Sequence, residues 1–326
     1  MIRQGERGAA LLSVLLLVAV MAVLAASALE RLKLSTHLAA NGAALDQARA
    51  FGQAAETLAL MRITDLVLRD AARTTLAGGW NGRRFNLPIP GGGAFARVRD
   101  GGNCFNLNSV GAGESPTELR PNPRAIAQFA ALMESIGIER AQASQVAAAL
   151  GDWVDADDIP APQGAEDDYY RTLATPYLAA NARLQDVSEL RAVAGVTPEL
   201  YDRLRPWICA LPEARLTRIN VNTLLPDQAP LFAMLLPDRV DVPRARQMLL
   251  ERPALGYSSL VDFWRLPALD ALGAPPEAVE QTALKTSWFT LEINVAVGEA
   301  ELQETALIDA SEMPARLVAR QWGDPS

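Results

Sequence analysis

GERGAALLSVLLL, residues 5–17, decides the fold, because a short charged leader meets a long apolar run within it. The run extends over residues 9–29, and all 21 of these residues are uncharged. At about 1.5 Å per residue, a helix of that length crosses the roughly 30 Å hydrocarbon core of a bilayer. The segment is therefore either a signal peptide that is removed or a membrane anchor that is kept.

The residues around the run favour the anchor. A signal peptide is the alternative, because Arg3 and Arg7 form a basic leader and residues 26–28, Ala-Ser-Ala, have the small-x-small form of a cleavage site. However, Glu6 is unusual in a basic leader, and the first proline of the chain is Pro88. The helical pattern can therefore continue far beyond the apolar run.

An apolar stripe at helical spacing follows the run and predicts a longer helix. Together, run and stripe predict one helix over residues 9–76, on the order of 100 Å long, with the stripe facing a core. The residues of the stripe are Leu34, Leu38, Leu45, Ala48, Ala55 and Leu58.

Composition disfavours two classes of function. The chain has 326 residues, 50% of them hydrophobic, and a net charge of −8, so it lacks the basic surface that nucleic-acid binding requires. Its one histidine, His37, lies just after the apolar run, which makes histidine-based catalysis and a zinc site improbable.

A charged leader that ends in glycine, followed by an apolar run that continues into an amphipathic helix, resembles the type IV pilins and type II secretion pseudopilins. The resemblance implies that a prepilin peptidase cuts between Gly8 and Ala9, with methylation, and that the apolar segment stays on the mature protein. Most members carry glutamate at the fifth mature position, where this chain has Ser13. In the family that carboxylate receives the amine of a neighbouring subunit, so a subunit without it fits the front of a filament.

Alternating residues predict a small sheet. Residues 94–99 and 104–108 alternate around the turn at residues 100–103, which predicts a β-hairpin. Residues 288–295, 301–308 and 315–322 predict further strands near the C-terminus. The region between carries helical signals, so we expect an α+β fold: a pilin-like long N-terminal helix packed on a small antiparallel sheet, with a large all-helical domain inserted between strands.

The expected boundaries follow from these signals. They are a leader over residues 1–8, the anchor and amphipathic helix over 9–76, the first β region over 77–111, the inserted helical domain over 112–284, and the C-terminal strands over 285–326.

Two units of the insertion, residues 186–201 and 256–269, look like helix-hairpin-helix or SAM-like modules, which bind DNA in some proteins. Between Asp186 and Arg205, however, four acidic residues accompany three arginines, so no basic patch faces a phosphate. We interpret the units as packing modules.

Two asparagine motifs flank much of the insertion: FNLNS at residues 105–109 and INVNT at residues 219–223. Asparagine side chains suit backbone groups at turns and strand ends, so both motifs are interpreted as junction elements. They also resemble motifs of the K-type minor pseudopilins, whose larger size comes from a helical insertion and which lack the glutamate that Ser13 replaces.

The acidic loop over residues 152–168 is the strongest chemical signal. Like charges in one loop repel unless a cation lies among them, and hard oxygen ligands suit Ca²⁺. The loop begins like an EF-hand, yet Ile159 and Pro160 fall where an oxygen ligand and a glycine are needed. A solvated acidic loop without metal is the simpler interpretation, and a glycosidase-like carboxylate pair is a remote one. The seven carboxylates are Asp152, Asp155, Asp157, Asp158, Glu166, Asp167 and Asp168.

The resemblance shifts this balance towards calcium, because K-type pseudopilins bind calcium in the helical domain. It implies one or two ions, and the spacing does not say which carboxylates bind them. We expect side-chain ligands among Asp155, Asp157, Glu166 and Asp167, followed by Asp158 and Asp168. Tyr169 and Tyr170 are expected to pack against Trp153 rather than touch the metal.

Cys104 and Cys209, the only cysteines, each precede an asparagine motif and therefore stand near the base of the insertion. In an oxidising periplasm they favour a disulfide over two buried thiols. Such a bridge would tie the helical domain to the sheet.

The resemblance as a whole implies a structural protein rather than an enzyme: a minor pseudopilin of the K type at the tip of the pseudopilus. It implies a single-pass inner-membrane protein with its bulk in the periplasm, and as partners the I-type and J-type minor pseudopilins, the major pseudopilin and the prepilin peptidase, with no nucleic acid. The alternative is a periplasmic or secreted calcium-binding protein with an ordinary signal peptide. A third is an anchored DNA-binding protein of the competence type.

Overall fold

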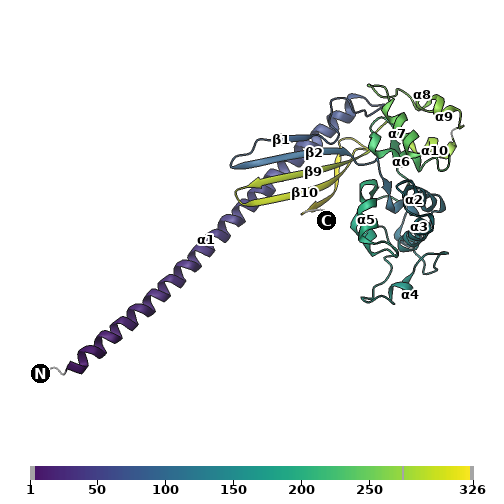
Figure 1. Ribbon diagram of the computed structural model, residues 1–326. Coiled ribbons are helices and arrows are strands. Elements are labelled where there is room, and N and C mark those ends of the chain that lie inside the picture. The colour runs from purple at the N-terminus through teal and green to yellow at the C-terminus, as the bar shows by residue number, and fades with distance from the viewer. Residues whose placement is uncertain (1–3, 274, 324–326) are drawn as a thin grey trace.

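A computed structural model describes residues 4–273 and 275–323. One long helix carries a twisted sheet along its second half, and a helical domain lies beyond the sheet (Figure 1). The predicted fold class is thereby confirmed. Residues 1–3 of the predicted leader lie outside the described residues.

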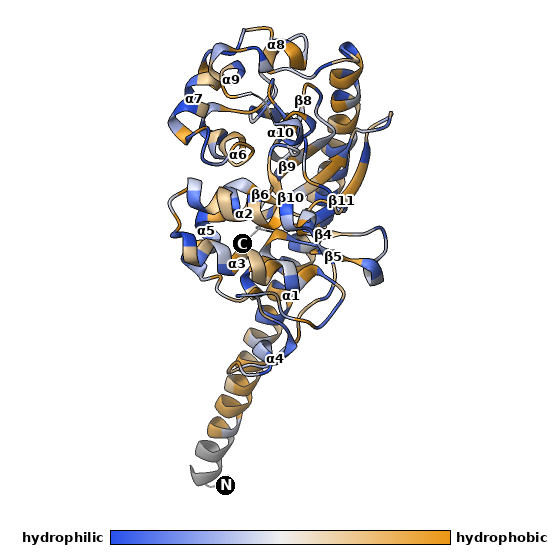
Figure 2. Cartoon of the chain, turned by 90° about the vertical axis from the view of Figure 1, so that its right-hand side faces the viewer, coloured by the Kyte–Doolittle hydropathy of each residue, from blue (hydrophilic) through white to orange (hydrophobic). Residues whose placement is uncertain are grey.

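The long helix, α1, runs from Gln4 to Arg69 without interruption. Among the described residues, it is the one helix long and apolar enough to cross a membrane, and its apolar 18-residue window is not buried. Figure 2 shows the hydrophobic residues of this helix in orange. The helix ends seven residues before the predicted end at residue 76. Asp70 stops it, because its carboxylate accepts a hydrogen bond from the backbone N–H of Ala72 and pairs with Arg73 at 2.9 Å.

The face of α1 that packs on the sheet differs partly from the predicted stripe. Leu34 and Leu38 are more than 60% exposed because they precede the sheet, and Leu58 is 47% exposed on the opposite face. The buried residues recur at steps of four and seven along one face, which is a helical periodicity. They are Ala48, Ala55, Ala59, Ile63 and Val67.

The sheet has five antiparallel strands in the order β1-β2-β9-β10-β11. Their bounds are Arg84–Leu87, Gly92–Asp100, Trp288–Val297, Ala300–Asp309 and Arg316–Trp322. Along β2 and β9 alternate side chains are buried against α1, and those between them face away. The insertion therefore leaves the sheet after β2 and returns at β9, which lie side by side.

The hairpin predicted for residues 94–108 does not form. Strand β2 is already paired on both sides, with β1 and β9, so no edge remains for the chain that follows it. The Asp100 carboxylate accepts the backbone N–H groups of Gly102 and Asn103, and this turn sends the chain out of the sheet. Residues 105–106 then pair in parallel with residues 208–209 inside the helical domain, whose core begins at Phe105.

The helical domain joins short helices around one hydrophobic core. Turns join its short α-helices, 3₁₀-helices and two-residue strands along the chain. The α-helices are α2 (Pro123–Ser135), α3 (Arg140–Val154), α4 (Asp167–Tyr170), α5 (Pro198–Leu204), α6 (Ala229–Ala233), α7 (Val242–Leu250), α8 (Leu260–Trp264), α9 (Pro267–Asp270) and α10 (Pro276–Glu280). The 3₁₀-helices are Leu107–Val110, Pro116–Glu118, Val187–Ala192, Arg205–Trp207 and Pro226–Gln228. The short strands are Phe105–Asn106, Gly111–Ala112, Arg120–Pro121, Ile208–Cys209, Ile219–Asn220 and Thr282–Ala283.

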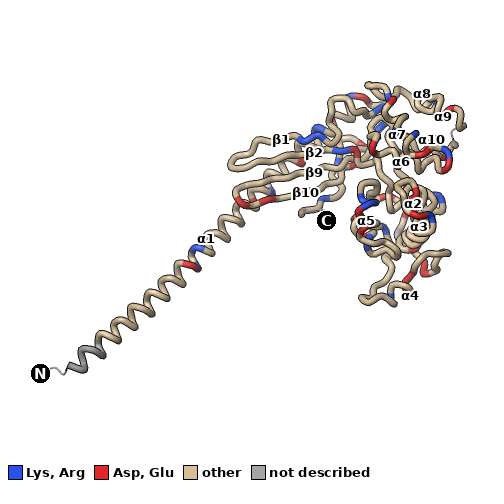
Figure 3. The backbone as a smooth tube through the Cα atoms, in the orientation of Figure 1, with Lys and Arg blue, Asp and Glu red and all other residues tan. Residues whose placement is uncertain are grey.

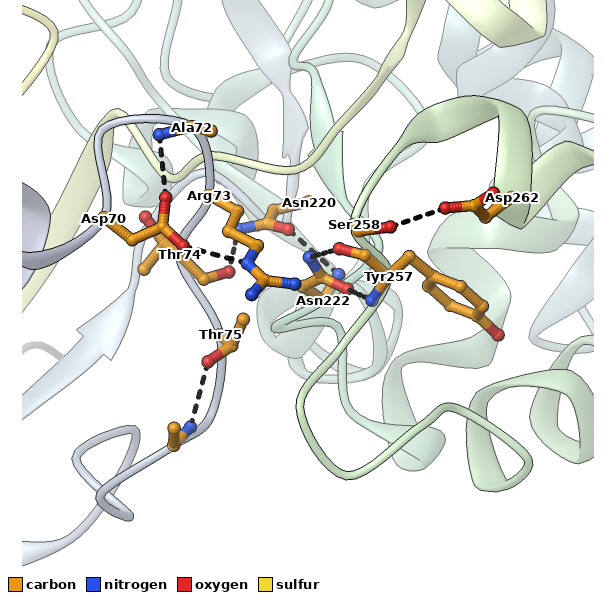
Figure 4. Close-up of polar contacts among 11 residues, drawn as sticks. Asp70, Ala72, Arg73, Thr74, Thr75, Asn220, Asn222, Tyr257, Ser258 and Asp262 are labelled. Atoms are coloured by element: carbon orange, nitrogen blue, oxygen red, sulfur yellow. Dashed lines mark hydrogen bonds and ion pairs between the residues drawn. The ribbon is translucent and has the colours of Figure 1, made fainter.

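Buried asparagines fasten these segments to one another. The Asn108 amide accepts the N–H of Leu184 at 2.7 Å and donates to the carbonyl oxygens of Leu184 and Leu211. In the second half, Asn222 accepts the N–H of Tyr257 and donates to its carbonyl (Figure 4). Side chains of both motifs thus form hydrogen bonds with backbone groups that have no partner strand. A junction element needs such hydrogen bonds because buried backbone groups must be paired.

INVNT also joins the helical domain to the end of α1. Asn220 donates to the backbone carbonyl of Thr74 (Figure 4). It also donates to the hydroxyl of Thr286. Thr286 and Thr223 both donate to the buried Asp100 carboxylate at the end of β2. Because these hydrogen bonds are buried, they fix the angle between the two parts of the molecule.

Candidate metal centre

The acidic loop connects α3 to α4 and places carboxylates at both of its ends. Asp152 lies in the last turn of α3, Asp155 is its C-cap, and Glu166 is the N-cap of α4. The chain between them turns back, so both helix ends face the same point. Like charges would drive such a loop apart in the absence of a cation.

Three carboxylates converge on that point. One oxygen from each of Asp152, Asp155 and Glu166 lies within 4.8 Å of the others. All three residues are buried, with 1%, 1% and 4% exposure respectively. Neither oxygen of Glu166 has a hydrogen-bond partner among the residues that the structure describes. Buried carboxylates that lack donors are costly, so this arrangement fits a cation with oxygen ligands.

The electrostatics of the cluster agree with this interpretation. Burial, followed by the charge of Asp157, raises the pKa of Asp155 to about 7. Burial, followed by the charge of Asp152, raises the pKa of Glu166 to about 8. Burial also raises the pKa of Asp152. In addition, Asp152 and Asp155 lie at the C-terminus of α3, where the helix dipole opposes negative charge and favours a cation.

The backbone packs closely around Asp152. Its two carboxylate oxygens accept the N–H of Ala161 at 3.2 and 3.1 Å. A Cβ atom at Gly164 would overlap the Asp152 carboxylate, so only glycine fits there. The loop is therefore shaped around this carboxylate, which indicates a built pocket.

The other predicted ligands point elsewhere. Asp157 accepts the N–H of Ile159, and Asp158 accepts a hydrogen bond from Asn181. Asp167 pairs with Arg171 at 2.7 Å, and the side chain of Asp168 is 100% exposed. The structure thus brings together two of the predicted ligands, Asp155 and Glu166.

Sequence reasoning did not place Asp152 among the ligands, although a signal existed. It lies three residues before Asp155, which is the spacing of neighbours on one helix face. Treating the start of the loop as the end of a helix would have paired the two carboxylates.

Aromatic residues that neighbour the cluster in the chain pack against one another. Tyr170 is fully buried, and its ring meets Trp153 edge-on with centroids 5.2 Å apart. Its hydroxyl accepts the N–H of Ala194, while Tyr169 packs on Tyr170. The expected packing against Trp153 is thus made by Tyr170, whereas Tyr169 contacts Tyr170 and is 45% exposed.

The two cysteines lie at the base of the helical domain. Cys104 and Cys209 are joined in a disulfide, with Cα atoms 5.8 Å apart and a sequence separation of 105. Cys209 lies in the short strand that pairs with residues 105–106. The bond closes a loop that contains FNLNS, α2 to α5 and the acidic cluster.

The remaining predicted site residues lie on α1. Ser13 is exposed in the apolar part of the helix. The expected cleavage point, between Gly8 and Ala9, falls within the same helix, where the structure describes the backbone alone.

Comparison with known proteins gives consistent matches. Two family models, both described as type II secretion system (T2SS), protein K, match residues 103–213 and 219–287. The chain is 39% identical to type II secretion system protein K of Klebsiella pneumoniae, covering 98% of this chain and 97% of the relative. It is 34% identical to the protein of that name from Pectobacterium carotovorum subsp. carotovorum, covering 98% of both chains.

A solved structure matches as well. It is a chain in the crystal structure of the GspK-GspI-GspJ complex from the enterotoxigenic Escherichia coli type 2 secretion system. The TM-score is 0.73 at 29% identity, covering 86% of this chain and 96% of the other.

Proposed function

The chain belongs to the type II secretion system protein K family, and from that premise we propose that it is the end subunit of a pseudopilus. As a minor pseudopilin it is a structural component of the secretion machinery. In this proposal α1 anchors it in the inner membrane, a prepilin peptidase removes the leader after Gly8, and the remaining parts lie in the periplasm. Assembly then begins at this subunit or is capped by it.

The position of the helical domain carries the proposal. It lies at the end of the molecule opposite the apolar segment of α1 (Figure 1). A filament of parallel subunits adds new members from the membrane side. A broad domain at the far end therefore leaves the lower face of the subunit free while obstructing the addition of a subunit above.

Ser13 also supports a position at the front of the filament. Glutamate at this position in related subunits receives the amine of the subunit ahead, since an unpaired charge in lipid is costly. Serine cannot make that ion pair. The structural relative is titled as a complex with GspI and GspJ, which supports I-type and J-type minor pseudopilins as partners. In this proposal they lie directly below the subunit, followed by the major pseudopilin.

Localising the subunit on assembled filaments tests the proposal. Antibody-gold labelling of sheared pseudopili should place the wild-type protein at one end. The variant Ser13→Glu keeps the helical domain that obstructs addition above, so it should also label one end only, and Ser35→Glu, outside the apolar run on the same helix, is the matched control. Wild-type label distributed along the shaft would contradict the proposal.

We also propose that Asp152, Asp155 and Glu166 bind calcium. The support is the buried, donor-free carboxylate of Glu166 next to two further buried carboxylates. Hard oxygen ligands in an irregular loop are the chemistry that Ca²⁺ selects. The ion would neutralise the cluster and hold the end of α3 against the start of α4.

Thermal unfolding with and without calcium tests this second proposal. A ligand at 100 times its Kd stabilises by about 2.7 kcal/mol, so calcium should raise the Tm of the wild type and a chelator should reverse the shift. Asp155→Asn should abolish the response. Asp168→Asn, whose side chain is fully exposed, should keep it. Equal loss in both variants, or no response in the wild type, would remove the site.

A further inference from the structure

An arginine cluster lies on the outer face of the sheet, away from α1. It comprises Arg84 on β1 and Arg97 and Arg99 on β2 (Figure 3). The chain as a whole has a net charge of −8, so a concentration of positive charge here is unusual for this protein. Such a patch attracts acidic partners.

The register of the strands places these arginines on one face of the sheet. Arg84 is the pairing partner of Arg97, so both lie on the same face, and Arg99 follows two residues later on that face. The opposite face of β2 is buried against α1 through Ala94, Ala96 and Val98. The cluster is therefore fixed by the pleat of the sheet.

One carboxylate, Glu292 on β9, offsets part of this charge. It lies 2.8 Å from Arg97 and 3.6 Å from Arg99. Arg84 instead lies over an aromatic ring, 4.6 Å from the centroid of Phe95. Three arginines against one glutamate leave a cluster charge of +2, and Arg84 is exposed.

Strand β1 adds an open backbone edge to the cluster. It pairs with β2 on one side and forms the edge of the sheet on the other. Residues 84–86 are exposed, and Phe85 is 41% exposed. An exposed edge strand can accept an added strand through main-chain hydrogen bonds, while its side chains select the sequence.

We propose that this surface binds an extended acidic segment of a partner protein, which adds to β1 as a strand with its carboxylates on the arginine cluster. Carboxylates match the planar guanidinium fork, and Glu292 already shows that geometry at Arg97. The surface is separate from the metal centre and from the filament end, so this interaction goes beyond the proposed function.

Anionic lipid is a poor occupant of this surface. Strand pairing connects Val98 across the sheet to Arg320, whose guanidinium pairs with Glu56 of α1. Glu56 lies 27 residues beyond Leu29, the last residue of the apolar run, which corresponds to about 40 Å of helix. Because the Debye length is about 8 Å at physiological salt, membrane charge is screened at that height.

Peptide binding to the full chain in nonionic detergent tests the proposal. The probe is a fluorescent (Thr-Glu)₅ peptide in 50 mM salt, followed by anisotropy, with (Thr-Lys)₅ as the charge control. A (Pro-Glu)₅ peptide has the same charge but cannot pair as a strand. A heparin hexasaccharide reports polyanion binding without a peptide backbone. Arg84→Glu and Arg99→Glu alter the surface, and Arg140→Glu, whose side chain is 75% exposed on α3, is the matched control.

We expect (Thr-Glu)₅ to bind, and Arg84→Glu or Arg99→Glu to weaken it about fivefold, as the loss of an exposed ion pair predicts. Arg140→Glu should bind as the wild type does. No binding of (Thr-Glu)₅, equal weakening by Arg140→Glu, or binding of heparin alone would overturn the proposal. If (Pro-Glu)₅ bound as tightly as (Thr-Glu)₅, addition as a strand would be overturned.

Discussion

Replacing Glu304 by glutamine should stabilise the pilin-like part of the protein above neutral pH. Glu304 lies on β10 beneath α1, its side chain is 0% exposed, and neither carboxylate oxygen accepts a hydrogen bond from the described residues. Arg320 on β11 lies 3.4 Å from Glu304 Oε1 and donates to Glu56 on α1 at 2.8 Å. One guanidinium is therefore shared by two carboxylates.

The magnitude follows from the pKa. Burial, followed by the nearby Glu56, raises the pKa of Glu304 from 4.5 to about 7. Between these values the unfolded chain has released the proton while the folded chain keeps it, so the free energy of unfolding falls as pH rises from 4.5 to 7. A difference of about 2.5 units is worth about 3 kcal/mol, and we expect about 2 kcal/mol after screening by solvent and the partly exposed Arg320.

Thermal unfolding of the full chain in detergent measures the effect. Glutamine has no charge to lose, so Glu304→Gln should match the wild type near pH 4.5 and exceed its Tm by about 5 °C at pH 8. Glu299→Gln, in the exposed turn between β9 and β10, is the matched control and should behave as the wild type. A difference between Glu304→Gln and the wild type that stays constant from pH 4.5 to pH 8 would refute the reasoning.

Three further predictions concern the helical domain, each measured by chemical unfolding followed by tryptophan fluorescence. Asn108→Ala should cost roughly 3 kcal/mol because it leaves buried backbone groups of Leu184 and Leu211 without partners, whereas Asn41→Ala on exposed α1 should be neutral. The double variant Cys104→Ser with Cys209→Ser should lose up to about 4–5 kcal/mol in the chain-entropy model; equal stability of wild type with and without reductant would contradict this. Gly256→Ala should lower the free energy of unfolding more than Gly298→Ala does. Both glycines have positive φ, but only a Cβ atom at residue 256 would meet the Asn222 side chain, at 2.6 Å. Equal losses of stability in the two variants would show that backbone conformation alone matters.

Sequence patterns predicted helices and strands correctly where the residues that determine them lie close together in the chain. The apolar run and the absence of proline before Pro88 predicted the long helix, because helix formation depends on neighbours within a few residues. The alternation of residues 288–295 and 301–308 predicted β9 and β10 for the same reason. The predicted C-terminal end of the long helix was less accurate, since α1 stops where the Asp70 side chain binds the backbone of Ala72.

Patterns failed where distant segments decide the outcome. The turn after Asp100 looked like a hairpin, but β9, almost 190 residues further along the chain, occupies the edge that the hairpin needed. Likewise, Leu34 and Leu38 have core-like spacing, yet the sheet begins beyond them, and nothing in their own sequence marks that point. In the acidic loop, spacing cannot tell Glu166, which points inward, from Asp167, which pairs with Arg171.

Two buried carboxylate clusters in this protein differ in the cation that can neutralise them. In the sheet, Glu304 and Glu56 share Arg320, so one fixed positive charge and one proton suffice to balance the pair. At the end of α3, three carboxylates converge, and no ion pair to any of them is found within the described residues. Protonation would also lower the charge, but the described residues outside the cluster give the Glu166 carboxyl no hydrogen-bond partner. A divalent ion supplies both the charge and the coordination, which is why we assign a proton-linked pair to the sheet and a metal to the loop.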